Sequence, residues 1–233
     1  MLKNFLAKIS KILNVSHLSR LVILIAIAFS AGVAAEFNLN KLASLAKQRY
    51  GDNTYQTVMA LNQLLIENKS SNELAKLTAI NNFFNQKMAF VSDIELWGNS
   101  DYWATPLESL GKEAGDCEDF SIAKYFFLRL SGIPSDKLRL TYVKAKLYQG
   151  DLKTTQAHMV LSYYSAPKSE PLILDNLIPD ILPASQRPDL SPIFSFNSSS
   201  LWVGNSDNPK GSSTTHLSRW RELIVRVQSD GIN

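Results

Sequence analysis

Apolar side chains recur every three or four positions along the first half of the chain, which is the spacing that gathers them on one face of a helix. Three stretches show it and predict helices: 53–67, 72–88 and the segment from Gly115 to Leu130. Asn72 is a typical N-cap residue, and Ser-Gly-Ile-Pro at 131–134 is a strong stop signal. The stretch 36–52 is interpreted as a linker into the folded domain.

The second half of the chain changes to the period of two that is typical of half-buried strands. A turn at Gly150-Asp151 and another at 166–168 separate the first three alternating runs. Pro and Ser dominate 179–199, which predicts a long loop. The predicted strands are 138–148, 157–164, 172–177, 201–203 and 220–227. Helices followed by an antiparallel sheet indicate an α+β fold.

The N-terminal 35 residues have a different character. They carry four basic and no acidic residues, then the apolar run 21–29, then the small residues 30–35. This order is typical of a secretory signal peptide, with cleavage expected near Ala35. Because the basic region is long, an uncleaved inner-membrane anchor is the alternative. We therefore predict a leader at 1–35, a single folded domain at 36–233, and export to the periplasm.

The net charge of +3 comes from the predicted leader. Without its four basic residues the remainder has 20 basic and 21 acidic residues, so the net charge is about −1. No basic surface remains to argue for a nucleic acid partner. Contact with a membrane is expected only through the leader.

Cys117 is the only cysteine, so an exported chain of this sequence forms no internal disulfide. A lone cysteine can serve as a small buried apolar side chain, but the position of Cys117 favours a role as a reactive thiol. It lies in the first turn of the helix after Gly115, where backbone N–H groups and the helix dipole lower a thiol pKa. Gly115 lacks a Cβ and would let a substrate backbone approach closely.

His158 and Asp175 lie in two successive predicted strands that should pair, so they can become neighbours on one face. A lone strand histidine or aspartate is commonly structural, but an aspartate among leucines and isoleucine needs a buried partner. We assign His158 as the general base, Asp175 as the residue that orients it, and Cys117 as the nucleophile. The Cys117 N–H is one expected oxyanion donor, and Trp103 in the aromatic-rich loop 92–106 is a candidate for the second.

At these residues the chain resembles a family. The segments 102–108 (YWATPLE), 115–120 (GDCEDF), 157–159 (AHM) and 174–176 (LDN), with Lys124-Tyr125, are similar to the bacterial transglutaminase-like cysteine proteinases, over roughly 50–205. Within that family the pattern resembles the LapG type, a periplasmic protease that releases large biofilm adhesins. The resemblance implies a papain-like, transglutaminase-like fold and the same Cys117, His158 and Asp175 triad.

The resemblance also implies dependence on Ca²⁺. The local sequence agrees, because Asp116, Glu118 and Asp119 flank the nucleophile and hard carboxylate oxygens suit calcium. Three carboxylates would otherwise raise the thiol pKa, and a bound cation removes that conflict. The alternative is that these carboxylates only complement the helix dipole.

Substrate and regulator are expected from the resemblance alone. The substrate would be the N-terminal region of a large surface adhesin, cut at a pair of alanines. The regulator would be an inner-membrane receptor for cyclic di-GMP that sequesters the protease and so controls biofilm attachment. Two other functions stay open: a transglutaminase that passes the acyl group to an amine, and a non-catalytic binding module on the same fold.

Overall fold

The computed structural model describes residues 37–150, 152–204 and 206–232. The predicted leader at 1–35 lies outside the described residues. Within them, no helix is both long and apolar enough to cross a membrane.

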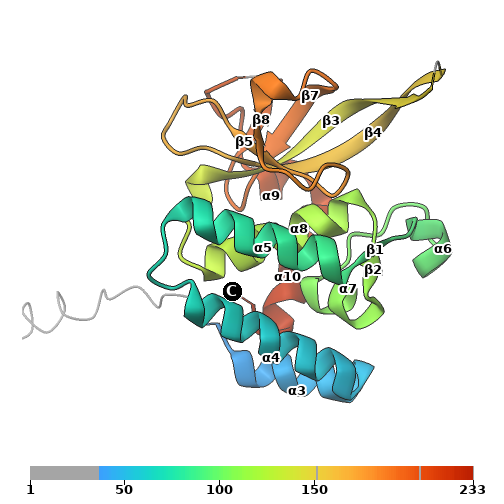
Figure 1. The fold of residues 1–233 in the computed structure, drawn as a ribbon, viewed down its shortest axis with the longest axis vertical. Coiled ribbons are helices and arrows are strands. Elements are labelled where there is room, and N and C mark those ends of the chain that lie inside the picture. The colour runs from blue at the N-terminus through green and yellow to red at the C-terminus, as the bar shows by residue number, and fades with distance from the viewer. Residues whose placement is uncertain (1–36, 151, 205, 233) are drawn as a thin grey trace, which may run out of the picture. The chain divides into compact units, whose positions relative to one another are not determined.

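The helices lie below a single large sheet (Figure 1). Helix α8 packs against strands β3 and β4 on one side and against α5 on the other. Helices α3 and α4 pack against each other farther from the sheet. The helices are α3 (Leu39–Tyr50), α4 (Asp52–Glu67), α5 (Glu73–Lys87), α6 (Asp93–Trp97), α7 (Pro106–Lys112), α8 (Cys117–Leu130), α9 (Ser213–His216) and α10 (Ser218–Ser229).

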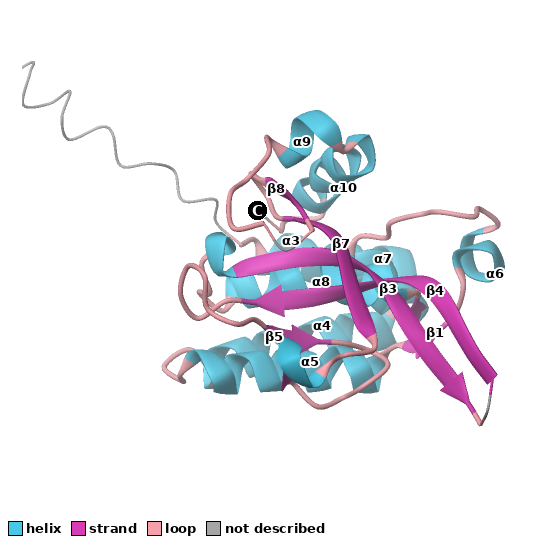
Figure 2. Cartoon of the chain, turned by 90° about the horizontal axis from the view of Figure 1, so that it is seen from above, coloured by secondary structure: helices cyan, strands magenta, loops and turns pink. Residues whose placement is uncertain are grey.

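The sheet has six strands in the order β6-β5-β4-β3-β7-β8, and every neighbouring pair is antiparallel. Strands β3 and β4 form a long hairpin that crosses above α8 (Figure 2). A parallel pair, β1 and β2, joins the segments before α6 and α8. The strands and short 3-10 helices are β1 (Ala89–Phe90), β2 (Ala114–Gly115), η1 (Ser135–Lys137), β3 (Leu138–Gln149), β4 (Leu152–Tyr163), β5 (Leu172–Leu174), β6 (Leu182–Pro183), η2 (Ala184–Gln186), β7 (Leu190–Phe196) and β8 (Leu201–Val203).

The predicted α+β class is confirmed, and the helices predicted in the first half are present. Asn72 caps α5 as expected, because its side chain accepts the Ala75 N–H at 2.9 Å. The core lies between α8 and the sheet, where Met159 and Leu161 of β4 are fully buried.

Five predictions of local structure were wrong. The predicted loop 92–106 contains the short helix α6. The stretch 36–52 is mostly helix α3, and the predicted loop 179–199 contains β6, η2 and the seven-residue strand β7. Strand β5 ends at Leu174, three residues early, so Asp175 follows the strand.

The fifth error is the stretch 220–227, which is not a strand but part of α10. Trp220, Leu223 and Val227 are its buried residues, and their spacing of three and four places them on one helix face. Trp220 is fully buried and packs against Phe126 and Phe196. The side chains of this helix therefore complete the core beneath the sheet.

The C-terminal end of the described chain is tied to its beginning. The Asn38 N–H donates to the Gly231 carbonyl at 2.9 Å. Asp230 is buried and accepts hydrogen bonds from Arg49 of α3, at 2.9 Å, and from the Thr105 hydroxyl, at 2.8 Å. These contacts fix α10 against α3 and the start of α7.

Candidate active site

Cys117 begins α8, and Asp116 is the N-cap whose side chain accepts the Glu118 N–H at 3.2 Å. Cys117 and His158 line the same pocket, with a volume of about 230 Å³. Its walls include the exposed apolar side chains of Phe90 and Leu177. The pocket is therefore the place where a substrate could meet both proposed reactive groups.

His158 and Asp175 are in direct contact, as strand pairing suggested. His158 Nε2 lies 2.8 Å from Asp175 Oδ1, and both side chains are almost fully buried. Strand β4 carries His158, and its pairing with β5 through Leu161 and Leu174 sets Asp175 beside it. Because Nε2 is occupied by Asp175, Nδ1 is the ring nitrogen left for proton exchange.

Every oxygen of Asp175 is hydrogen-bonded. The Leu177 N–H donates to Oδ1 at 3.1 Å, and Arg187 Nη2 donates to Oδ2 at 2.8 Å. The main-chain carbonyl accepts from Asn85 at 2.8 Å and from Lys124 at 3.1 Å. Burial acts to raise the pKa of the Asp175 carboxyl, but its hydrogen bonds to His158 and Arg187 outweigh burial and lower the pKa to about 2. The carboxylate is therefore firmly ionised at neutral pH.

Asp93, Asp116 and Asp119 form an acidic cluster in which one carboxylate oxygen of each lies within 4.8 Å of the others. One oxygen of Asp93 and one of Asp119 are buried without a hydrogen-bond partner among the described residues. The remaining oxygens accept main-chain N–H groups of Tyr102 at 2.5 Å and Ala104 at 2.8 Å, respectively.

Electrostatic strain is concentrated in this acidic cluster. Burial, and after it the charge of Asp116, raises the pKa of Asp119 well above its usual value. Burial raises the pKa of Asp93 to about 6, and burial with the charge of Glu118 raises that of Asp116 to about 7. Buried carboxylate oxygens that lack partners and repel one another match the donor set that a hard cation such as Ca²⁺ requires. The residues present therefore fit calcium.

Two of the three predicted metal ligands, Asp116 and Asp119, belong to the acidic cluster, and Asp93 joins them. Glu118 groups instead with Asp116 and Cys117, and its Oε2 accepts from the Cys117 thiol at 2.6 Å. The ligand role of Glu118 remains a prediction. Asp93 was missed because it lies 23 positions before Asp116, where it begins α6 inside a stretch that the sequence predicted to be a loop. Its only signal was an acidic residue after Ser92, in a helix-start pattern.

The expectation of a lowered thiol pKa for Cys117 does not match its surroundings. Burial is the first cause that raises its pKa, and the negative charge and hydrogen bond of Glu118 are the next. The helix N-terminus is present, but neighbouring carboxylates outweigh it. The sequence predicted this conflict between a nucleophilic thiolate and its carboxylate neighbours, and it predicted that a bound cation would resolve it.

Gly115 has a different role from the one predicted. It is buried, and a Cβ there would lie 2.6 Å from the Asp119 Cβ and 2.7 Å from its Oδ2. The missing side chain therefore makes room for the acidic cluster rather than for a substrate backbone.

Trp103 is buried and is not among the residues that line the Cys117 pocket. Its ring stacks on Phe196 with centroids 5.7 Å apart, and it lines a separate hollow with Phe194 and His216. The indole Nε1 is buried and has no hydrogen-bond partner among the described residues. The oxyanion role of Trp103 therefore remains a prediction.

The family model of the bacterial transglutaminase-like cysteine proteinases matches residues 49–191, and the chain belongs to this family. The family consists of cysteine peptidases. Membership also confirms the transglutaminase-like fold that the resemblance predicted. None of the curated proteins searched matches the chain.

The chain is similar to solved structures of LapG from Legionella pneumophila. The EGTA-treated structure is 42% identical, with a TM-score of 0.71, and the match covers 83% of this chain and all of that one. The calcium-bound structure is also 42% identical, with a TM-score of 0.68 and coverage of 81% and 98%. The predicted resemblance to the LapG type is confirmed.

Proposed function

We propose that the protein is a calcium-dependent cysteine endopeptidase in which Cys117, His158 and Asp175 form the catalytic triad. The observation that carries the proposal is the buried His158–Asp175 pair on the pocket that also holds Cys117. An aspartate bound to Nε2 fixes the ring so that Nδ1 can take the thiol proton.

The reaction would proceed in two steps. His158 takes the proton of Cys117, and the thiolate attacks the scissile carbonyl carbon. Collapse of the tetrahedral adduct breaks the peptide bond, forms a thioester, and releases the amine with the proton from His158. Water, deprotonated by His158, then attacks the thioester, and the released thiolate regains its proton. Asp175 stabilises the imidazolium that forms in each step.

Calcium would be held by Asp93, Asp116 and Asp119, with Glu118 as a further candidate ligand. A bound Ca²⁺ would supply positive charge beside Cys117, which offsets the carboxylates that raise its pKa. The calcium-bound and EGTA-treated forms of the Legionella relative support a role for calcium.

For the biological setting, we propose a periplasmic enzyme that cleaves the N-terminal region of a large surface adhesin at a di-alanine site. Support comes from the leader pattern at 1–35 and from the similarity to LapG. Control by an inner-membrane cyclic di-GMP receptor belongs to the same proposal. The pocket volume of about 230 Å³ suits small residues on both sides of the scissile bond.

The test uses purified protein and an adhesin N-terminal fragment with an Ala-Ala site, with cleavage followed on a gel. Calcium, magnesium and EGTA conditions are compared for the wild type and for Cys117→Ala. We expect cleavage only with calcium and only with the thiol. Cleavage by Cys117→Ala would refute the nucleophile. Incorporation of a labelled amine without hydrolysis would instead identify a transglutaminase.

A further inference from the structure

Arg187 is a buried arginine that lies between two aspartates. Its side chain is 1% exposed, although arginine is among the residues least often buried. It follows the short helix η2 within the segment that the sequence predicted to be loop. Nη2 donates to Asp175 Oδ2 at 2.8 Å, while Nε and Nη2 donate to the two oxygens of Asp189 at 3.0 and 2.8 Å.

The contacts form a chain of charged groups that ends at the proposed base. Asp175 gives one carboxylate oxygen to His158 and the other to Arg187, so its plane is fixed from both sides. Asp189 binds the Arg187 guanidinium through two oxygens, which fixes the guanidinium in turn. A rotation of the Asp175 carboxylate would therefore break hydrogen bonds on both sides.

The cost of burying Arg187 argues against a purely structural role. Nη1 is buried and has no hydrogen-bond partner among the described residues. A buried charged group with an unused donor is destabilising relative to a well-packed apolar side chain of similar volume. What Arg187 supplies that an apolar residue could not is the second hydrogen bond to Asp175.

We propose that Arg187 is a positioning residue of the protease, which holds the Asp175 carboxylate in the orientation that aligns the His158 ring. The inference rests on the proposed function, because it concerns the same triad. The lowered pKa of Asp175 is consistent with it, since Arg187 is among its causes. Neither the sequence pattern nor the family resemblance pointed to this residue.

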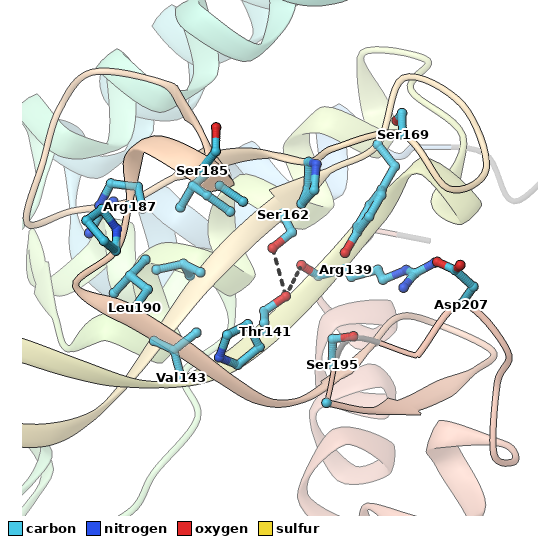
Figure 3. Close-up of a pocket in the computed structure, with 18 residues that line it drawn as sticks. Arg139, Thr141, Val143, Ser162, Ser169, Ser185, Arg187, Leu190, Ser195 and Asp207 are labelled. Atoms are coloured by element: carbon cyan, nitrogen blue, oxygen red, sulfur yellow. Dashed lines mark hydrogen bonds between the residues drawn. The ribbon is translucent and has the colours of Figure 1, made fainter.

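Arg187 can also be reached from a pocket that does not contain Cys117. This pocket has a volume of about 500 Å³, and Arg187 and Arg139 lie on opposite sides of it (Figure 3). Arg139 stacks between Tyr164 and Trp202, at 4.2 and 4.0 Å from their ring centroids. Arg139 has no hydrogen bond or ion pair with Asp175 and is therefore a matched control. A small cation could enter the pocket and occupy the space of a truncated Arg187.

The experiment compares Arg187→Ala, Arg187→Lys and Arg139→Ala in the full chain with calcium. Proteolysis gives kcat and KM, thermal unfolding reports the fold, and proton NMR follows the low-field resonance of the His158 N–H bound to Asp175. For Arg187→Ala we expect kcat to fall by roughly 10- to 100-fold, as for other residues that orient a catalytic ligand, with little change in KM. Added guanidinium ion should restore part of kcat and of the resonance.

Arg187→Lys should lie between wild type and Arg187→Ala, and Arg139→Ala should keep wild-type kcat. Wild-type kcat and an unchanged resonance in folded Arg187→Ala would overturn the inference. The inference would also be overturned if kcat fell in both Arg187→Ala and Arg139→Ala in proportion to their loss of stability, and if guanidinium did not restore it.

The NMR readout separates this inference from the proposed function. If the wild type fails to cleave any peptide but the His158 resonance still needs Arg187 and returns with guanidinium, the positioning role stands and the protease proposal falls. If the wild type cleaves and the His158 resonance is the same in Arg187→Ala as in the wild type, the protease proposal stands and the positioning role falls.

Discussion

The Asp175 carboxylate contacts His158 of the Cys117 pocket, and the acidic cluster reaches the same pocket through Asp116. The two differ in how completely protein donors satisfy their oxygens. Each oxygen of Asp175 has a protein donor, and its pKa is lowered to about 2. Asp93 and Asp119 each keep a buried oxygen without a partner, and their pKa values are raised. The chain thus completes one site from its own residues and leaves the other suited to an external cation.

The largest expected effect is on catalysis through the completed site. Asp175→Asn preserves shape but removes the charge that stabilises the imidazolium and favours the wrong ring tautomer. We expect kcat to fall by roughly 10³- to 10⁴-fold, in line with the same change in a serine protease triad. Steady-state proteolysis with calcium measures it. Activity within a few-fold of wild type would show that His158 does not depend on this carboxylate.

The second prediction concerns the incomplete site. Saturating calcium should raise the free energy of unfolding of the wild type by about 3 kcal/mol at a concentration one hundred times Kd. Asp119→Asn should lose most of that gain, because it removes a charged ligand. Thermal unfolding with calcium and with EGTA measures both. Asp136→Asn, a change at an exposed aspartate, is the matched control and should respond like the wild type. An equal calcium response in Asp119→Asn would place the ion elsewhere.

The third prediction tests Asp175 by pH. Its folded pKa of about 2 lies below the ordinary value of 3.8, so its contribution to stability is present above about pH 4 and is lost as pH falls towards 2. The shift corresponds to about 2 kcal/mol. Chemical unfolding of the wild type should lose that much more stability between pH 5 and 2 than Asp175→Asn does. Parallel pH profiles would contradict the proposed ionisation.

The smallest expected effect concerns the two side chains that donate to the main-chain carbonyl of Asp175, and it tests whether one of them is sufficient. Asn85 and Lys124 both donate to its main-chain carbonyl, so Asn85→Ala leaves one donor in place. We expect a loss of about 1 kcal/mol in the free energy of unfolding, from one hydrogen bond. Asn82→Ala, at an exposed position of the same helix α5, corrects for the change in helix propensity. A loss above about 3 kcal/mol would mean that Lys124 cannot hold the carbonyl alone.

Local patterns in the sequence predicted local structure well. Helical spacing located α4, α5 and α8, and alternation located the β3–β4 hairpin. The pairing of His158 with Asp175 was also predictable, because two strands joined by a short turn usually pair. These features depend on residues that are close along the chain.

The misread segments share a physical cause. The run 220–227 is rich in β-branched and aromatic residues, which favour strands, but its buried positions follow the helical period, and packing against Phe126 and Phe196 decided the outcome. Strand β7 was hidden because Pro and Ser are uncommon in strands. It forms by pairing with β3, whose partner residues lie 45 to 56 positions earlier in the chain, from Ala145 with Leu190 to Leu140 with Phe196.

The parts of the site that could not be predicted depend on contacts between distant segments. Asp93 joins Asp116 and Asp119 through the parallel pairing of β1 with β2, and Arg187 reaches Asp175 from across the β5–β6 turn. In the sequence, Arg187 is only a charged residue two positions before Asp189. Only the folded backbone shows that Arg187 contacts Asp175 of the proposed triad.

The tie between the two ends of the described chain has a consequence for the order of folding. Asn38 and Arg49 find Gly231 and Asp230 as partners only after nearly the whole polypeptide is available. A ribosome or a translocation channel releases α3 and its packing partner α4 well before α10, so the two helices can meet while these hydrogen bonds are still unmade. The last residues of the described chain therefore close the tie to α3 late in folding.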